Sequence, residues 1–391
     1  MPSNQIMIIA GEPSGDSLAA ELVDEIRRQG PGRICPRIFG LGGPKLQHAG
    51  VDLLVDMTKH TVFGLIEALA RYRQFKRIFN QALKAAEERQ PDLIILVDFG
   101  GFNLRFAKAL RKRIRSNSGT FQNWQPKIAY FIPPQVWASR AGRAATIAET
   151  IDLVISIFPF EKDWYQDRFP QLPVHYVGDP MATRFPFSKT PRRMLTDTTP
   201  KKVSRLVLLP GSRKQEIERH LPIMLEALEL IRRHKPVEAT IVTPTNEHTA
   251  PFRNLAPSGI QWQEGKLEAA LIEAELALAS SGTVTRECAY LRVPTVVIYK
   301  LSKLTYEIAK RIVKVRFIAM PNILADKMIF PELIQDAANP LAIAQEALQL
   351  FDPAGRQELM EDLERVVLSL GPPGATKRAA KSIVNLLQTD R

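Results

Sequence analysis

The stretch that decides the fold is residues 274–300, AELALASSGTVTRECAYLRVPTVVIYK. The apolar run Leu276–Ala279 predicts a buried strand, and Thr295–Tyr299 predicts the next one. Between them, the small-residue turn Ser280–Thr283 leads into a helix that begins near Val284. Strand, turn, helix and strand in this order form one unit of a parallel α/β sheet.

The turn in this stretch also predicts a binding site for an anion. A helix that opens on Ser281, Gly282 and Thr283 offers backbone N–H groups and hydroxyls, with the positive end of the helix dipole behind them. Such a helix end binds phosphate or diphosphate. Glu287 follows one turn later, where its carboxylate can accept hydrogen bonds from a ribose. The alternative, from this stretch alone, is an ordinary N-capped helix of an α/β domain.

Length and composition indicate a soluble protein of two domains. The chain has 391 residues, of which 45% are hydrophobic and 24% charged. Its net charge of +12 favours an anionic partner, but the absence of a Lys/Arg tail weighs against nucleic acid. The two cysteines, Cys35 and Cys288, suit a reducing cytoplasm and argue against a structural zinc site. We expect no signal peptide, and no apolar run reaches the ~20 residues that span a bilayer.

Strand–helix alternation in both halves predicts two doubly wound, Rossmann-like domains of the α/β class with a cleft between them. We expect an N-terminal domain over residues 1–185 and a linker, rich in Pro, Lys, Arg and Thr, over residues 186–202. A second domain is expected over residues 203–359. A C-terminal helix over about residues 360–391 is expected to pack back on the first domain.

Two turns of the first half carry candidate site residues. AGEPSGD at 10–16 follows a buried strand, and its glycines allow close approach of the backbone to a ligand, although the motif is weak. The strand Leu93–Val97 ends at Asp98, a good place for a general base because functional groups gather at the carboxyl ends of parallel strands. A lone Asp at a strand end is, however, more often a helix cap or a turn former.

The second half begins with a similar turn, Pro210–Arg213, at the end of a strand. Arg213 can form paired hydrogen bonds with a diphosphate, together with the helix that follows Thr283. Such an arrangement suits a sugar nucleotide whose leaving diphosphate is stabilised electrostatically while Asp98 deprotonates an attacking hydroxyl. No Asp-x-Asp pair is present to hold a divalent ion, so we expect neither a metal nor another cofactor.

Residues 57–79 form the most amphipathic stretch of the sequence. Its apolar side chains lie among lysines and arginines and include Val62, Phe63, Leu65, Ile66, Leu69 and Tyr72. This pattern fits a helix that docks on an anionic membrane surface. It also fits a helix that buries its apolar face against its own sheet, and the residues alone favour this second interpretation.

In order and spacing, the motifs of nearly the whole chain resemble the lipid-A-disaccharide synthases, glycosyltransferases of the GT-B type. The resemblance rests on AGEPSGD (10–16), VDFGGFN (97–103), PPQVWASR (133–140), FPFEKDWY (158–165), YVGDPM (176–181), LLPGSRKQEI (208–217), SSGTVTREC (280–288) and LTYEIAKRIVKVRFIAMPNILADKMIFPELIQ (304–335). The family joins UDP-2,3-diacylglucosamine to 2,3-diacylglucosamine 1-phosphate with inversion and releases UDP.

The resemblance implies a role for each matching residue. Asp98 would be the base. The donor and its UDP would be bound by Gly211, Ser212, Arg213, Gly265, Ser281, Gly282, Thr283, Glu287, Asn322 and Gln335. The acceptor and the reacting sugars would lie near Glu12, Ser14, Gly15, Asp16 and Asn103. The segment from Val62 to Tyr72 would contact the membrane.

The resemblance also implies the partners: a UDP-sugar donor, an acylated sugar phosphate acceptor and an anionic membrane surface, without nucleic acid. The protein would be cytoplasmic and peripheral on the inner face of the inner membrane, as a monomer or homodimer.

The sequence departs from the family pattern mainly on the acceptor side. The positions concerned are Gly101, Pro133 to Gln135, Ser139, Asp179, Arg286 and Ala325 to Lys327. They leave open a divergent paralogue that uses a UDP-sugar with another acceptor or is catalytically silent. A sugar-nucleotide epimerase on the same fold and a basic nucleic-acid-binding protein are further alternatives.

Overall fold

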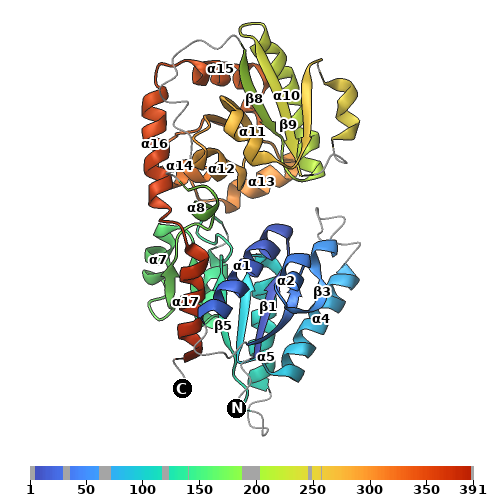
Figure 1. Cartoon of the computed structure of the whole chain (residues 1–391), viewed down its shortest axis with the longest axis vertical. Helices are drawn as coiled ribbons and strands as arrows, with labels where there is room; N and C mark the ends of the chain where they lie inside the picture. The colour runs from blue at the N-terminus through green and yellow to red at the C-terminus, as the bar shows by residue number, and fades with distance from the viewer. Residues whose placement is uncertain are drawn as a thin grey trace. The chain divides into compact units, whose positions relative to one another are not determined.

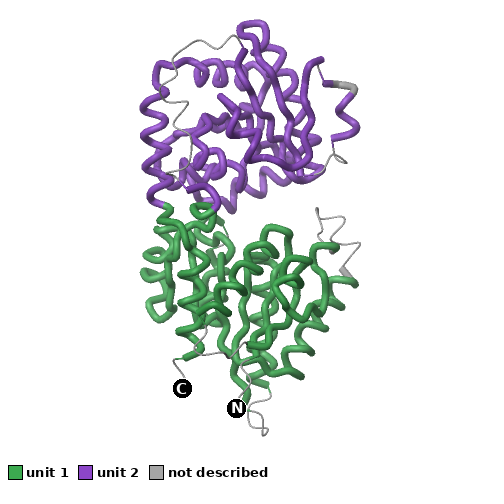
Figure 2. The backbone as a smooth tube through the Cα atoms, viewed as in Figure 1, with its two compact units in different colours: residues 1–183, 370–391 green, residues 184–369 purple. Residues whose placement is uncertain are grey.

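The protein is described by a computed structural model that covers residues 5–29, 36–60, 72–116, 123–139, 141–186, 203–244, 249–256 and 258–388. The chain divides into two compact units, which consist of residues 1–183 with 370–391 and of residues 184–369 (Figure 2). Each unit is an α/β structure built on its own parallel sheet.

The first unit has a sheet of seven described strands in the order β3-β2-β1-β4-β5-β6-β7, all parallel (Figure 1). The strands are β1 (Gln5–Ala10), β2 (Arg37–Gly42), β3 (Asp52–Asp56), β4 (Leu93–Val97), β5 (Lys127–Phe131), β6 (Leu153–Ser156) and β7 (Val174–Tyr176). β1 and β4 are almost wholly buried and apolar, as expected for central strands covered on both faces.

Helices cover both faces of this sheet. They are α1 (Pro13–Gln29), α2 (Pro44–His48), α4 (Tyr72–Arg89), α5 (Gly100–Ser116), α6 (Gly142–Thr150), α7 (Pro159–Gln166) and α17 (Ala375–Gln388). A short helix, α8 (Met181–Arg184), follows β7 in the chain. Side chains of α4, α5 and α6 form one continuous core with the sheet. α1 and α17 pack against each other, and α17 also contacts β5 and β6.

The second unit has a sheet of six described strands in the order β10-β9-β8-β11-β12-β13. The strands are β8 (Ser204–Leu209), β9 (Val237–Thr243), β10 (Ile260–Glu264), β11 (Leu276–Ser280), β12 (Thr295–Tyr299) and β13 (Glu332–Ile334). Its helices are α10 (Lys214–Arg232), α11 (Leu267–Glu273), α12 (Val284–Tyr290), α13 (Lys303–Ile312), α14 (Met320–Ala325), α15 (Pro340–Phe351) and α16 (Arg356–Ser369). α10 and α15 share one core with the sheet, while α12, α14 and α16 pack together.

The C-terminal segment differs from the single helix expected over about residues 360–391. It consists of α16, which belongs to the second unit, and α17, which belongs to the first. Pro372 and Pro373 separate the two because proline cannot continue a helix. Gly371 and Gly374 on either side have φ angles of +85° and +92°, which favour glycine. α17 packs against α1 of the first unit.

Both sheets contain a switch point. At this point the chain connections that follow two neighbouring parallel strands run toward opposite edges of the sheet. In the first unit this point lies between β1 and β4, with Ala10 opposite Val97. In the second unit it lies between β8 and β11, with Leu209 opposite Ala279. Ligands of open α/β sheets bind at the carboxyl ends of the strands at such points. The topology therefore marks one candidate site on each unit.

Candidate functional site

The switch point of the first unit brings together two turns that the sequence singles out. The turn after β1 begins at Gly11, and the turn after β4 begins at Asp98. A Cβ atom on Gly11 would overlap the ring of Phe99, so the glycine is needed for the two turns to touch. Phe99 in turn stacks on Phe102 of α5, with ring centroids 5.3 Å apart.

Asp98 is held in an unusual backbone conformation. Its φ angle is +47°, and that of Phe99 is +49°, a region that residues other than glycine rarely adopt. Such conformations cluster at functional sites, where the surrounding structure stabilises them. The side chain of Asp98 is half-buried at the end of β4.

Three hydrogen bonds fix the Asp98 backbone. Its N–H donates to the carbonyl of Phe131 at 3.0 Å. Its carbonyl accepts from the amide of Asn103 at 2.7 Å and from the hydroxyl of Tyr130 at 2.9 Å. Burial raises the pKa of Tyr130, and the negative charge of Asp98 raises it further, so this hydroxyl stays protonated and remains a donor. The fully buried Asn103 therefore positions Asp98.

The predicted sugar-binding residues of the first turn fall into two groups. Asp16 is buried, and its carboxylate accepts from the N–H groups of Gly43, Lys45 and Leu46 at 2.7, 3.0 and 3.1 Å. These N–H groups lie at the start of α2, so Asp16 caps that helix. Glu12 is half-buried and Ser14 is exposed, and both lie beside the buried Gly15 at the start of α1.

At the switch point of the second unit, the turn after β8 is built around a carboxylate of its own. Gly211 has a φ angle of +124°, and a Cβ atom there would come within 2.5 Å of the Glu216 carboxylate. That carboxylate accepts from the N–H groups of Ser212 and Arg213 at 3.1 and 3.3 Å. The turn is thus shaped to present N–H groups to an anionic oxygen.

The Arg213 side chain is 53% exposed, and its guanidinium lies 3.6 Å from the second oxygen of Glu216. A contact of this length at the surface stabilises the pair only weakly. The guanidinium can therefore turn toward a diphosphate without loss of a strong bond. Of the groups in this turn, Arg213 is the one most available to a ligand.

The turn after β11 lies next to this loop, on the adjacent strand of the same sheet. Gly282 and Thr283 are exposed at the start of α12, while the hydroxyl of Ser281 donates to the carbonyl of Ile318 at 3.0 Å. Glu287 is half-buried on α12. The predicted phosphate-binding turns of the second unit are thus neighbours.

His220 is a residue of this site that the sequence did not reveal. It is fully buried on α10, and its Nε2 accepts from the N–H of Lys300 at 2.9 Å. Because Nε2 is the acceptor, Nδ1 carries the proton and donates to the carbonyl of Pro210 at 2.9 Å. Burial lowers the pKa of His220, against the hydrogen bond to Pro210, which raises it. The neutral ring therefore ties the Gly211 turn to the end of β12.

Three further residues that were predicted to bind the sugar-nucleotide donor have structural roles within the chain. Asn322 is fully buried, and its amide donates to Phe330 and Glu332 and accepts from the N–H groups of Ile329 and Phe330. Gln335 accepts from the N–H of Leu301 at 2.6 Å and donates to its carbonyl at 3.3 Å. Gly265, with a φ angle of +65°, forms the turn after β10. The polar atoms of Asn322 and Gln335 are engaged within the chain.

The predicted membrane-contacting residues Val62, Phe63, Leu65, Ile66 and Leu69 lie outside the described residues, and of Tyr72 only the backbone, at the start of α4, is described. That prediction stays untested. Within the described part of the chain, no helix is long and apolar enough to cross a membrane. Among the same residues, no three His, Cys, Asp or Glu side chains are grouped as metal ligands.

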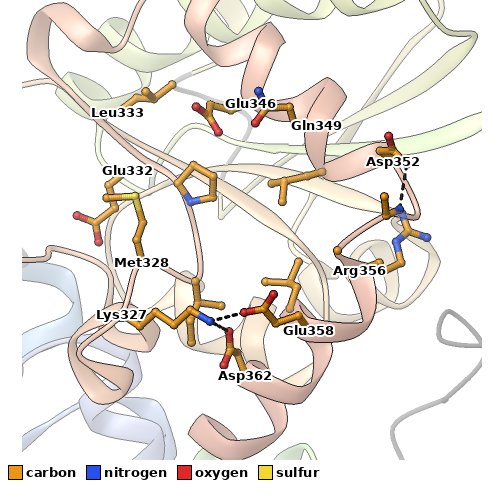
Figure 3. A pocket seen from close by; sticks show the side chains of 16 residues that line it. Lys327, Met328, Glu332, Leu333, Glu346, Gln349, Asp352, Arg356, Glu358 and Asp362 are labelled. Carbon is orange, nitrogen blue, oxygen red and sulfur yellow. Dashed lines mark hydrogen bonds and ion pairs between the residues drawn. The ribbon is translucent and has the colours of Figure 1, made fainter.

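A pocket of about 370 Å³ lies elsewhere on the second unit, between residues 327–333, which include the start of β13, and helices α15 and α16 (Figure 3). At its lower rim Lys327 bridges to Glu358 and Asp362, at 2.7 and 2.8 Å. Its lining carries more carboxylates than cations, because Glu332 and Glu346 also contribute. Such a lining repels a diphosphate, so this pocket is a poor candidate for the donor site.

Comparisons with known proteins find similar sequences over nearly the whole chain. A family model described as lipid-A-disaccharide synthetase matches residues 6–384. A lipid-A-disaccharide synthase of Myxococcus xanthus is 35% identical over 99% of this chain and 98% of its own length. One from Syntrophus aciditrophicus is 36% identical over 99% of both chains.

Solved structures show the same fold at low sequence identity. A putative UDP-N-acetylglucosamine 2-epimerase from Listeria monocytogenes aligns with a TM-score of 0.65 at 14% identity, over 100% of this chain and 98% of its own. MurG of Acinetobacter baumannii aligns with a TM-score of 0.57 at 15% identity, over 99% of both chains. At these identities the likeness concerns the fold alone.

Proposed function

The chain belongs to the lipid-A-disaccharide synthase family. From this premise we propose that the first switch point carries the general base and that the second binds the donor diphosphate. The chain is a glycosyltransferase that forms lipid A disaccharide. We propose that it joins UDP-2,3-diacylglucosamine to 2,3-diacylglucosamine 1-phosphate with inversion and releases UDP. Identity of 35–36% over almost the whole chain carries this conclusion. An epimerase is disfavoured because the likeness to epimerases, at 14% identity or less, extends only to the fold.

Asp98 is the proposed general base. The acceptor hydroxyl must lose its proton as it attacks the anomeric carbon, and a carboxylate at a strand end of a switch point is placed for this task. Support comes from the backbone of Asp98, which Asn103 and Tyr130 fix in a strained conformation. A base fixed in this way keeps one orientation, which favours proton transfer.

Arg213 is the proposed main contact of the donor diphosphate, together with the exposed turn at Gly282 and Thr283. Negative charge grows on the diphosphate as UDP leaves, so a guanidinium and N–H groups directed at it stabilise the transition state. Glu216 already occupies the N–H groups of Ser212 and Arg213. We therefore assign the diphosphate to the guanidinium and to the second turn, and the ribose to Glu287.

Asn322 and Gln335 are proposed as supports of the donor site, since their side chains hold neighbouring backbone segments. Glu12 and Ser14 are proposed to contact the sugars, and Gly15 leaves room for them. For Asp16 we propose an indirect role, through the cap on α2. The diphosphate charge is assigned to Arg213 and to backbone amides, so we expect transfer to proceed equally with and without EDTA.

We further propose that the enzyme is cytoplasmic and peripheral, at the inner face of the inner membrane, as a monomer or homodimer. Its acylated substrates reside in lipid, and the net charge of +12 favours an anionic surface.

The proposed function is tested by transfer between the two acylated sugars with the purified full-length chain. Asp98→Asn keeps size and shape but removes the base, and we expect the rate to fall by about 10²–10⁴-fold. Asp92→Asn is the matched control, because Asp92 is exposed at the other end of the same strand. Wild-type turnover by Asp98→Asn would disprove the assigned base, and no product from the wild type would disprove the function.

A further inference from the structure

Helix α13 (Lys303–Ile312, orange in Figure 1) has no buried residue. Leu304 is 75% exposed, Ile308 is 51% exposed, and Val313, directly after the helix, is 41% exposed. Ser302 caps the helix by accepting from the N–H of Thr305 at 3.2 Å. A well-formed helix of the described chain thus presents large apolar side chains to the surroundings.

The exposed apolar side chains of α13 lie on one face. Leu304 and Ile308 are four residues apart, so they are neighbours along one side of the helix. Single exposed apolar residues are common at protein surfaces, but a stripe of them on one helix marks an interaction surface. This face of the helix is therefore suited to a partner that accepts apolar side chains.

Cations border this stripe. Lys303, Lys310, Arg311, Lys314 and Arg316 lie in or just after α13, with Glu307 as the one carboxylate among them. Glu307 lies 3.5 Å from Lys310, a pair whose two side chains are both more than half exposed. An apolar stripe with a basic border is typical of helices that lie in the interface of an anionic membrane.

A second copy of this chain is a poor partner for the same face. The net charge is +12, so self-association through α13 would bring two basic surfaces together. The cores of protein interfaces are also depleted in lysine. An anionic lipid surface meets both requirements, since it accepts the apolar side chains and neutralises the cations.

The location of α13 fits this role. The helix begins shortly after the carboxyl end of β12, which pairs with β11, and β11 leads into the Gly282–Thr283 turn. The backbone of Leu301, just before the helix, is hydrogen-bonded to the side-chain amide of Gln335. A lipid surface at α13 would therefore lie beside the edge of the second unit where we place the donor, whose acyl chains start in lipid.

We propose that α13 is a membrane-docking helix of the second unit, with Leu304 and Ile308 inserted at the interface and the surrounding cations on anionic headgroups. The inference rests on the proposed function insofar as acylated substrates bring the enzyme to lipid. It adds a described element to the predicted membrane contact at Val62–Tyr72.

The test is sedimentation of the full-length protein with vesicles of phosphatidylglycerol and phosphatidylethanolamine, compared with neutral phosphatidylcholine vesicles. We expect the double variant Leu304→Glu, Ile308→Glu to bind anionic vesicles at least tenfold more weakly than the wild type. Leu341→Glu is the matched control, because Leu341 is 60% exposed on α15, a helix without cations, and should bind like the wild type.

UDP binding and molar mass, measured on the same samples, separate the outcomes. Unchanged UDP affinity shows that the double variant is folded. Wild-type vesicle binding by the double variant would overturn the inference. So would a loss of dimers without a loss of vesicle binding, because it would assign the face to a second copy. Absence of transfer by the wild type in detergent-dispersed substrates would instead refute the proposed function and leave the vesicle result standing.

Discussion

The two switch points are built from similar strand–turn–helix units but are stabilised in different ways. In the first unit the backbone of Asp98 is strained and is held by the side chains of Asn103 and Tyr130. In the second, the Gly211 turn surrounds the Glu216 carboxylate and rests on the neutral ring of His220. The first arrangement fixes the backbone that carries one carboxylate. In the second, Glu216 engages the N–H groups of the turn, and the guanidinium of Arg213 stays exposed and adjustable.

This difference fits the proposed division of labour, in which the first turn carries the base and the second turn binds the diphosphate. Chemistry requires a single orientation of the base, whereas binding a flexible diphosphate tolerates adjustment of a long cationic side chain. Variants of the first turn should therefore lower the rate of transfer, and variants of the second should weaken binding of UDP.

After Asp98→Asn, whose expected loss of rate is given above, the next largest effect on this comparison is expected for Arg213→Ala. Loss of a charge-assisted contact of about 1.5–3 kcal/mol should weaken UDP binding by about 10–100-fold. Titration calorimetry with UDP measures it. Arg205→Ala is the control, because Arg205 is an exposed arginine near the start of the same β8 strand and pairs with Glu273. Equal losses for both variants would mean that Arg213 acts only through general charge.

Asn103→Ala should act on the first switch point alone. Without the amide, the Asp98 carbonyl loses one donor and the base loses its fixed orientation, so we expect kcat to fall about tenfold or more. The free energy of unfolding should fall by about 1–3 kcal/mol, because a buried hydrogen-bonding side chain is removed. UDP affinity should stay unchanged, and weaker UDP binding would show that the two turns are not independent.

Two glycines of the first unit provide a matched pair. In Gly11→Ala the new methyl group would displace Phe99 and so disturb Asp98, and we expect a several-fold lower kcat. Gly101→Ala has open space around the new Cβ on α5, where alanine stabilises a helix by up to about 1 kcal/mol. Transfer rates and thermal unfolding of both variants check this. A lower transfer rate in Gly101→Ala, with a wild-type rate in Gly11→Ala, would contradict the role given to Gly11 in positioning Asp98.

The smallest effect concerns pH. Burial lowers the pKa of His220, with a smaller contribution from Arg219, while Glu216 and the bond to Pro210 act in the opposite direction. A lowered pKa in the folded state means that the stabilisation is present above the unfolded value near 6.5 and is lost as pH falls below it. Protonated Nε2 cannot accept from Lys300, so UDP binding should weaken a few-fold between about pH 7 and pH 5.

His220→Gln should show a flatter pH dependence of UDP binding than the wild type. His175→Gln is the control, since burial also lowers the pKa of His175, but that residue lies on β7 of the first unit. Its substitution should leave the pH dependence of UDP binding as in the wild type. Identical profiles for His220→Gln and the wild type would remove His220 from the donor site.

Much of the fold follows from local sequence pattern. The strands at Leu276–Ala279 and Thr295–Tyr299 and the helix from Val284 form as expected, because short apolar runs separated by small residues encode parallel α/β units. Asp98 also lies at the strand end where the pattern places it. Pro372 and Pro373 mark the break between α16 and α17, because proline cannot continue a helix.

The parts of the site that the sequence did not reveal depend on distant contacts. His220 bonds to Lys300, 80 positions away, and no local pattern signals such a pair. Asp16 and Asn322 carry groups suited to ligands, yet the fold engages them with backbone N–H groups of other segments. Residue type at a motif position thus indicates where a site lies, but not whether a side chain faces the ligand or supports the chain.

The division of labour between the two turns is tested most directly by measuring Asp98→Asn and Arg213→Ala side by side, for UDP affinity and for the single-turnover rate at saturating donor. We predict that Asp98→Asn binds UDP like the wild type but transfers about 10²–10⁴-fold more slowly. Arg213→Ala should bind UDP about 10–100-fold more weakly and should keep most of its rate once saturated. Loss of UDP binding in Asp98→Asn together with wild-type binding in Arg213→Ala would contradict the account.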